Sequence, residues 1–191
     1  MTTGVEQDVL DLLLDQHNRL RSLLWRLSDG PGARRRELFE TLVGLLAAHE
    51  VAEEVVVHPT AQRAIADGAE LVEARKQEEE RARRDLAELY ELGVDHPDFD
   101  ARMAEFATAM VEHASREELE EFPYLRQSAA PEQLRRMADA VRVAEAAAPT
   151  RAGTHGGAAA HGALIAEPPI AVFDRVRDAV RRWRDSPEGW T

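Results

Sequence analysis

The sequence predicts an all-α protein, an antiparallel four-helix bundle with additional C-terminal helices. Two observations carry this prediction. The 191-residue chain is 44% hydrophobic, only 5% aromatic, and dominated by Ala, Leu, Glu and Arg, which is typical of helical proteins. Apolar residues recur with a period of about 3.6 along four long segments, as in amphipathic helices. Runs of alternating Val, Ile and Thr, which would predict strands, do not occur.

The first two helices are predicted on either side of a Gly- and Pro-containing turn. The first runs from about residue 6 to 28, and its apolar stripe includes His17. The sequence DGPG at residues 29–32 should end it. The second runs over about residues 33–65, and Pro59 is expected to end or kink it, because proline lacks the amide donor that a helix interior needs.

The next two helices complete the predicted bundle. Asp67 and Gly68 mark a turn, and the third helix follows over about residues 69–92. The fourth covers about residues 100–127, with Tyr124 expected on its inner stripe. Short loops between long amphipathic helices favour antiparallel neighbours.

The remaining residues predict an extension of the bundle. A shorter fifth helix is expected at residues 131–147, so that the helical bundle spans residues 1–147. Residues 148–169 are rich in Gly, Ala and Pro and are interpreted as a linker. Residues 170–191 predict an amphipathic helix with Ile170 on its apolar side. We expect this helix to pack on the bundle or on a partner subunit.

Composition excludes several classes of function. The net charge of −12 argues against nucleic-acid and anionic-membrane partners. The absence of cysteine excludes disulfides and thiolate metal sites. No signal peptide and no run of about 18 apolar residues is present, so a cytoplasmic protein is expected. The oligomeric state stays open, with a homodimer among the alternatives.

Polar residues interrupt three apolar stripes at a spacing typical of metal ligands. His17, His49 and His113 each have an apolar residue seven positions away, about two helical turns, so these side chains should point into the core. Glu53 follows His49 by four residues, and Glu117 follows His113 by four. That spacing lets two side chains on one helix face share a centre. Because a buried carboxylate is costly unless it is paired or bound to metal, the pattern predicts a metal site.

The third predicted helix offers a carboxylate to this site. The apolar stripe projects a core position onto Glu79, whereas Glu80 lies about 100° around the helix and is the less favoured alternative. The resulting nitrogen and oxygen donors suit iron or manganese, and zinc is a further option. The alternative interpretation is that the histidines are ordinary half-buried residues and that the Glu-rich segments are solvated faces.

Other histidines and the arginines receive weaker assignments. His58 lies about half a turn from His49 on an ideal helix, although distortion at Pro59 could bring it near the site. His96, in a loop, and two linker histidines, His155 and His161, are expected to be exposed. Two arginine clusters are expected to form surface ion pairs, namely Arg34 to Arg36 and the group of Arg81, Arg83 and Arg84. No hydrolase or nucleotide-binding motif is present, so no catalytic residue is assigned.

Three segments together resemble the hemerythrin-like family, also called the HHE cation-binding domain. They are DQHNRLRSLL around His17, LLAAHEVAEEVVVHP from His49 to Pro59, and MVEHASREELEEFPYL from His113 to Tyr124. The resemblance covers about residues 6–127. Its most specific part is the pair of H-x-x-x-E-E segments, each followed closely by a proline.

The resemblance implies a four-helix bundle with a non-haem di-iron centre that binds dioxygen or reacts with peroxide or nitric oxide. By position, the three histidines His17, His49 and His113 would be terminal ligands, and Glu53 and Glu117 would bridge the irons. Glu118 is the alternative if the last helix is rotated. Family members generally carry histidine on the third helix, where this chain has none. A carboxylate there should stabilise the ferric pair and disfavour reversible oxygen carriage, and it leaves manganese or a mixed pair open.

Three functional hypotheses follow. The first is a di-iron protein that senses or detoxifies dioxygen, peroxide or nitric oxide. The second is a di-iron oxidase or oxygenase acting on a small organic substrate. The third is a metal-storage or structural interaction module. Whether the chain is an enzyme is left undecided between them, with oxidoreductase chemistry of the peroxidase, catalase or oxidase type as the enzymatic option.

Overall fold

A computed structural model describes residues 7–29, 32–149 and 167–187, and every regular element within them is helical. The elements are α1 (Val9–Asp29), α2 (Gly32–Ala52), the π-helix η1 (Glu53–Val57), α3 (His58–Ala64), α4 (Gly68–Leu92), α5 (Phe99–Arg116), the π-helix η2 (Glu117–Glu121), α6 (Phe122–Ser128), α7 (Pro131–Ala147) and α8 (Pro169–Arg184). The predicted all-α class is confirmed. Most of the predicted linker lies outside the described residues.

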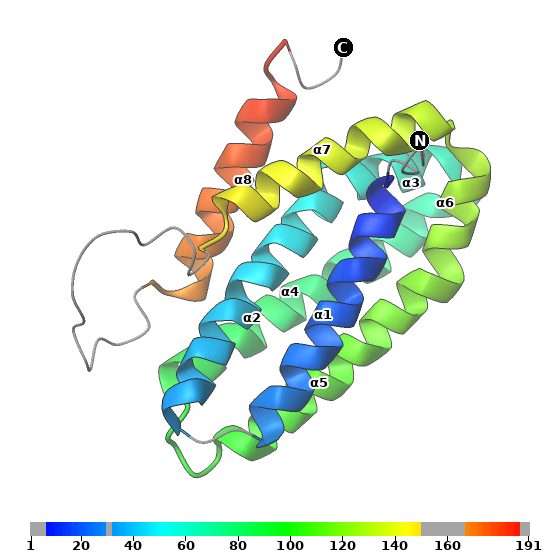
Figure 1. Cartoon of the computed structure of the whole chain (residues 1–191). Coiled ribbons are helices and arrows are strands. Elements are labelled where there is room, and N and C mark those ends of the chain that lie inside the picture. The colour runs from blue at the N-terminus through cyan, green and yellow to red at the C-terminus, as the bar shows by residue number, and fades with distance from the viewer. Residues whose placement is uncertain (1–6, 30–31, 150–166, 188–191) are drawn as a thin grey trace, which may run out of the picture.

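Four long helices form the bundle that the apolar periodicity predicts. α1, α2, α4 and α5 run alternately up and down around a common core (Figure 1). α3 and α6 lie against each other at one end of it. The turn predicted before α4 is present, with Asp67 in the left-handed region at a φ of 59°. Glycine is required at position 68, because a Cβ there would lie 2.4 Å from the Ala61 carbonyl oxygen.

Two further helices cover one side of the bundle. α7 packs against α1 and α2, and α8 packs against α2, α4 and α7 (Figure 1). α8 buries Val172, Phe173, Val176 and Val180. Ile170, predicted on that apolar side, is instead 70% exposed, because it precedes Val172 by two residues and so lies about 160° away around the helix. None of the described helices is both long enough and apolar enough to cross a membrane.

The two π-helices correct the predicted phase of the second and fourth helices. The amide of His58 donates to the Glu53 carbonyl, and that of Phe122 donates to the Glu117 carbonyl, five residues back in each case. A π-turn contains one residue more than an α-turn, so the inner stripe shifts by one position beyond it. Tyr124 is therefore 55% exposed rather than buried, and Leu125 takes the inner position.

Candidate metal centre

The three candidate histidines come from three different helices and meet inside the bundle. His17 on α1, His49 on α2 and His113 on α5 are all buried. Nε2 of His17 lies 3.1 Å from Nε2 of His49. Nε2 of His113 lies 3.1 Å from Oε1 of Glu117, one turn along the same continuous helix. The shared depth follows from apolar stripes that point each imidazole inward.

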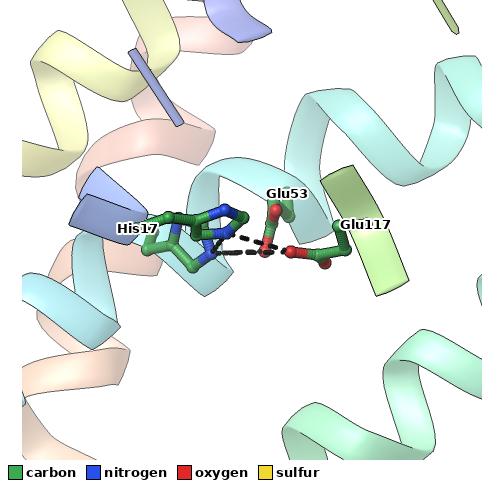
Figure 2. Close-up of side chains that lie close together, drawn as sticks. His17, Glu53 and Glu117 are labelled. Carbon is green, nitrogen blue, oxygen red and sulfur yellow. Dashed lines mark hydrogen bonds and ion pairs between the residues drawn. The ribbon is translucent and has the colours of Figure 1, made fainter. Parts of the chain in front are cut away.

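The two glutamates stand at the first residue of each π-helix and face the same point. Figure 2 shows His17, Glu53 and Glu117 pointing toward one another. Glu117 Oε2 is 3.1 Å from Nε2 of His17, and Glu53 Oε2 is 3.4 Å from Nε2 of His49. Both carboxylates are fully buried. Each π-helix thus begins at a fully buried candidate ligand.

The donor atoms form two overlapping sets. The nitrogen-rich set comprises His17, His49, Glu53 and Glu117, and the carboxylate-rich set comprises Glu53, Glu79, His113 and Glu117. Within each set, one donor atom per residue lies within 4.8 Å of all the others. Glu53 and Glu117 belong to both. Because a carboxylate has two oxygens, these two residues have the chemistry needed to bridge two neighbouring cations.

The outer nitrogen of each histidine in these sets is held by a hydrogen bond. The Nδ1 atoms lie 2.8 Å from Glu118 for His17, 3.1 Å from Gln16 for His49 and 2.9 Å from Glu78 for His113. An ionised carboxylate only accepts hydrogen bonds, so Nδ1 donates to Glu118 and to Glu78. Each Nε2 is then directed to the centre, an arrangement typical of metal-bound histidines.

Gln16 settles the orientation of His49 in the same way. The Gln16 amide nitrogen donates to Glu145 at 3.0 Å, so the amide oxygen faces His49 and accepts from its Nδ1. With both Nδ1 atoms acting as donors, the neutral rings of His17 and His49 would direct two Nε2 lone pairs at each other across 3.1 Å. A proton or a metal ion between them removes this repulsion, and the donor geometry therefore fits a cation.

Unpartnered oxygens give a second test of the fit. Both carboxylate oxygens of Glu53 and both of Glu117 are buried without a well-directed hydrogen bond from the described residues. Groups of this kind cost several kcal/mol unless a partner is supplied. Nitrogen and carboxylate oxygen together suit iron or manganese, and they are also compatible with zinc. The residues present therefore fit the metal that the sequence predicts.

In the metal-free protein, protons on the histidines and glutamates offset the buried negative charge that a cation would otherwise offset. Burial alone would lower the pKa of His113, but the nearby charge of Glu117 and the hydrogen bond to Glu78 raise it to about 11. Burial would raise the pKa of Glu117, yet His113 holds it well below its ordinary value. Burial and the charge of Glu117 raise the pKa of Glu53. A bound cation would take over the charge compensation that the imidazolium provides.

The structure distinguishes the alternatives left open on two helices. Glu79 is buried in the carboxylate-rich set, whereas Glu80 is on the surface, 68% exposed, and pairs with Arg84 at 3.0 Å. Glu118 lies outside both sets. It accepts from Nδ1 of His17 and from Arg21, the latter at 2.9 Å. Glu118 is therefore placed to orient a candidate ligand and not to be one.

His58 reaches the centre from beyond the first π-helix. Its Nε2 lies 2.5 Å from Oε1 of Glu79, and its Nδ1 lies 3.9 Å from Oε1 of Glu121. All three side chains are buried. Burial would lower the pKa of His58, but its hydrogen bond to Glu79 and the negative charges of Glu121 and Glu79 raise it to about 10. His58 thus lies outside both donor sets and forms a hydrogen bond with the carboxylate of Glu79.

Glu121 is a buried residue of this region that sequence reasoning missed. A repeated pattern could have revealed the geometry: residues 49–59 and 113–123 both read H-x3-E-x4-[H/F]-P. In both segments the glutamate starts a π-helix, and the proline is the second residue after the end of that π-helix. The matching prolines are the sequence signal for the changed phase, since proline interrupts regular α-helical hydrogen bonding.

Arg83 was predicted to form a surface ion pair and does not. Its side chain is 25% exposed, and two of its partners, Glu50 and Glu79, are buried. Arg84 does form such a pair with Glu80. His96 lies in the exposed α4–α5 connection as expected. The linker histidines, His155 and His161, fall outside the described residues.

A small cavity reaches the histidines between α1 and α5. His17, His49 and His113 contribute to its lining together with apolar side chains that include Leu20, Leu24 and Met110. Its volume is 10 Å³, which is about the space one water molecule needs. The cavity therefore gives room beside the nitrogen donors for a very small molecule.

The fold and site define a helical-bundle protein with a buried histidine and glutamate cation site. Comparison with known families agrees: the chain belongs to the hemerythrin HHE cation-binding domain family, whose model matches residues 8–125. Among solved structures, it is similar to a hemerythrin HHE cation-binding domain-containing protein from Mycobacterium kansasii. The TM-score is 0.64 at 18% identity, covering 73% of this chain and 86% of that one. At this identity the likeness shows the fold alone. The comparison with functionally curated proteins gave no match.

Proposed function

We propose that the chain is a non-haem di-iron protein that binds or reacts with dioxygen, peroxide or nitric oxide, as a sensor or a detoxifier. The observation that carries this proposal is the sharing of Glu53 and Glu117 by two donor sets. Two-metal sites in proteins hold their ions about 3.5–4 Å apart, and bridging carboxylates suit that separation. When bound, an iron pair supplies electron exchange with small oxidants.

The protein's own residues support this chemistry by orientation and by exclusion of water. Hydrogen bonds from Nδ1 fix the rings of His17, His49 and His113, so that the Nε2 donors need little rearrangement. All the residues of both donor sets are buried. Donors that are buried and already oriented bind a cation tightly and keep water away from it.

The size of the cavity favours a small oxidant over an organic substrate. The 10 Å³ space beside the histidines cannot hold a molecule much larger than water. A larger hollow of 570 Å³ lies between α4 and α5, where Leu89 and Phe106 form part of its wall. It is lined by no member of either donor set. The space beside the histidines is thus better matched to a small oxidant than to an organic substrate.

The proposal is tested on the full chain produced with iron. We expect two irons per chain, and a visible spectrum of the reduced protein that changes on exposure to dioxygen, peroxide or nitric oxide. His49→Ala and His113→Ala should each lose metal and reactivity, whereas His96→Ala, at an exposed loop histidine, should match the wild type. Stoichiometric manganese or zinc in place of iron would overturn the metal assignment.

Thermal stability supplies an independent measurement. A ligand that binds only the folded state stabilises it by about 2.7 kcal/mol at 100 times its Kd. Chelation should therefore lower the Tm of the iron-loaded wild type by several degrees. Protein without stoichiometric metal and with a Tm unchanged by chelation would support the structural-module hypothesis instead.

A further inference from the structure

Arg83 on α4 lies among three carboxylates beside the carboxylate-rich set. Its Nε is 3.6 Å from Glu50, its Nη1 is 3.5 Å from Glu54 and its Nη2 is 3.6 Å from Glu79. Glu50 and Glu79 are almost completely buried. One guanidinium thus presents a different nitrogen to each carboxylate, and one of these carboxylates is a candidate metal ligand.

α8 contacts Arg83 directly and also binds Glu54, one of the three carboxylates near Arg83. The Phe173 ring of α8 lies 5.8 Å from Cζ of Arg83, within the range of a cation–π contact. Arg177 of α8 donates hydrogen bonds to Glu54 from Nε at 3.1 Å and from Nη2 at 3.0 Å. Arg181 donates to the same carboxylate at 3.3 Å. Because Arg177 and Arg181 also neutralise Glu54, more of the charge of Arg83 is available to Glu50 and Glu79.

We infer that Arg83 is a positioning residue that sets the charge on the carboxylate-rich half of the centre, and that α8 holds it there through Phe173 and Arg177. This inference rests on the proposed di-iron function. α8 lies beyond residue 125, where the family match ends, so this contact joins a helix inside the matched segment to one outside it. A fixed positive charge beside Glu79 favours the ferrous over the ferric state at that half.

The consequence is a change of reduction potential with a definite sign. Removing the positive charge of Arg83 leaves Glu50 and Glu79 less compensated, which stabilises the more highly charged ferric ion. At a fixed applied potential, Arg83→Gln should raise the ferric-to-ferrous ratio on the order of tenfold, because the guanidinium acts on the metal from behind Glu79 and so interacts with it more weakly than a directly paired charge would. A role limited to packing would alter stability and leave the potential unchanged.

The chain offers a matched control in the next residue. Arg84→Gln removes the same charge from the same helix, but Arg84 pairs with exposed Glu80. Arg83→Lys keeps the positive charge and should retain most of the wild-type potential. Phe173→Leu keeps an apolar side chain in the α8 interface while removing the aromatic face, so it should shift the potential in the same direction as Arg83→Gln but by less.

The experiment is a redox titration of the iron-loaded full chain, followed by its visible spectrum, for the wild type and these four variants. Thermal melts of the chelator-treated proteins report folding separately. Equal potentials for Arg83→Gln and Arg84→Gln would overturn the inference while the proposed function stands. A shift in Arg83→Gln with none in Phe173→Leu would overturn the role of α8. A wild type that binds no iron would overturn the proposed function and this inference together.

Discussion

The segments 49–59 and 113–123 share one backbone design but carry different side chains just before the proline. Each brings a histidine, then a glutamate at the start of a π-helix, and then a side chain that folds back one turn beyond it. In the first segment that side chain is His58, 2.5 Å from Glu79. In the second it is Phe122, whose ring stacks on His17 at 5.6 Å and 10°. One design thus makes one end of the centre charged and the other apolar.

This difference changes what Glu79 is expected to do. A carboxylate in place of the family's third-helix histidine predicts extra negative charge and a stabilised ferric pair. The structure sets two cationic groups against that charge, the His58 imidazole at 2.5 Å and the Arg83 guanidinium at 3.6 Å. Because opposite charges a few ångströms apart largely offset each other, the carboxylate-rich half is less anionic than its ligands alone suggest.

The largest expected effect comes from removing a carboxylate that both donor sets share. Glu117→Gln replaces a carboxylate common to both donor sets by an uncharged side chain of similar size. We expect iron content to fall from two per chain to less than one, since both ions lose an anionic ligand. Metal analysis after gel filtration measures this.

Glu112→Gln is the matched control, because Glu112 lies on the same helix with its side chain 62% exposed. It should keep both irons. Loss of only one iron in Glu117→Gln would show that Glu117 serves a single half and that the two donor sets do not share it.

The sequence predicts most of this arrangement but not the difference between its ends. Regular α-periodicity is sufficient for the four long helices and for the inward direction of His17, His49 and His113. It fails beyond Glu53 and Glu117, because counting 100° per residue assumes an uninterrupted α-helix. This count therefore predicts Tyr124 inside the bundle, brings His58 near the site only if Pro59 distorts the helix, and gives Glu121 no role. The tertiary role of Arg83 depends on α8 and cannot be derived from local spacing.

The next largest effect is expected from a substitution that makes the charged end of the centre, next to His58, resemble the apolar end next to Phe122. His58→Phe places at the first segment the residue found at the equivalent position of the second. Glu79 and Glu121 then lose one of their cationic partners, so the metal-free protein should lose about 1–3 kcal/mol of unfolding free energy. Affinity for one iron should fall about 10–100-fold, as is typical when a hydrogen-bonded neighbour of a ligand is removed.

Urea unfolding of the chelated protein and anaerobic titration with ferrous iron check these two effects. His96→Phe, at the exposed loop histidine, should change neither. If both irons weakened equally in His58→Phe, the two ends of the centre would not be independent, and the contrast between them would lose its functional meaning.

The smallest effect tests the apolar end. Phe122→Leu removes the ring stacked on His17 while keeping an apolar side chain, and aromatic contacts of this kind contribute about 0.5–1.5 kcal/mol. The affinity of the nitrogen-rich set for iron should fall less than about tenfold, because Glu118 still accepts the hydrogen bond from Nδ1 of His17.

Phe39→Leu is the control: Phe39 packs edge-on against Phe99 at 5.8 Å, and neither belongs to a donor set. The two variants should lose similar stability in urea, but only Phe122→Leu should alter iron affinity. Equal iron affinities would mean that Phe122 only fills space, and that the hydrogen bond to Glu118 alone sets the orientation of His17.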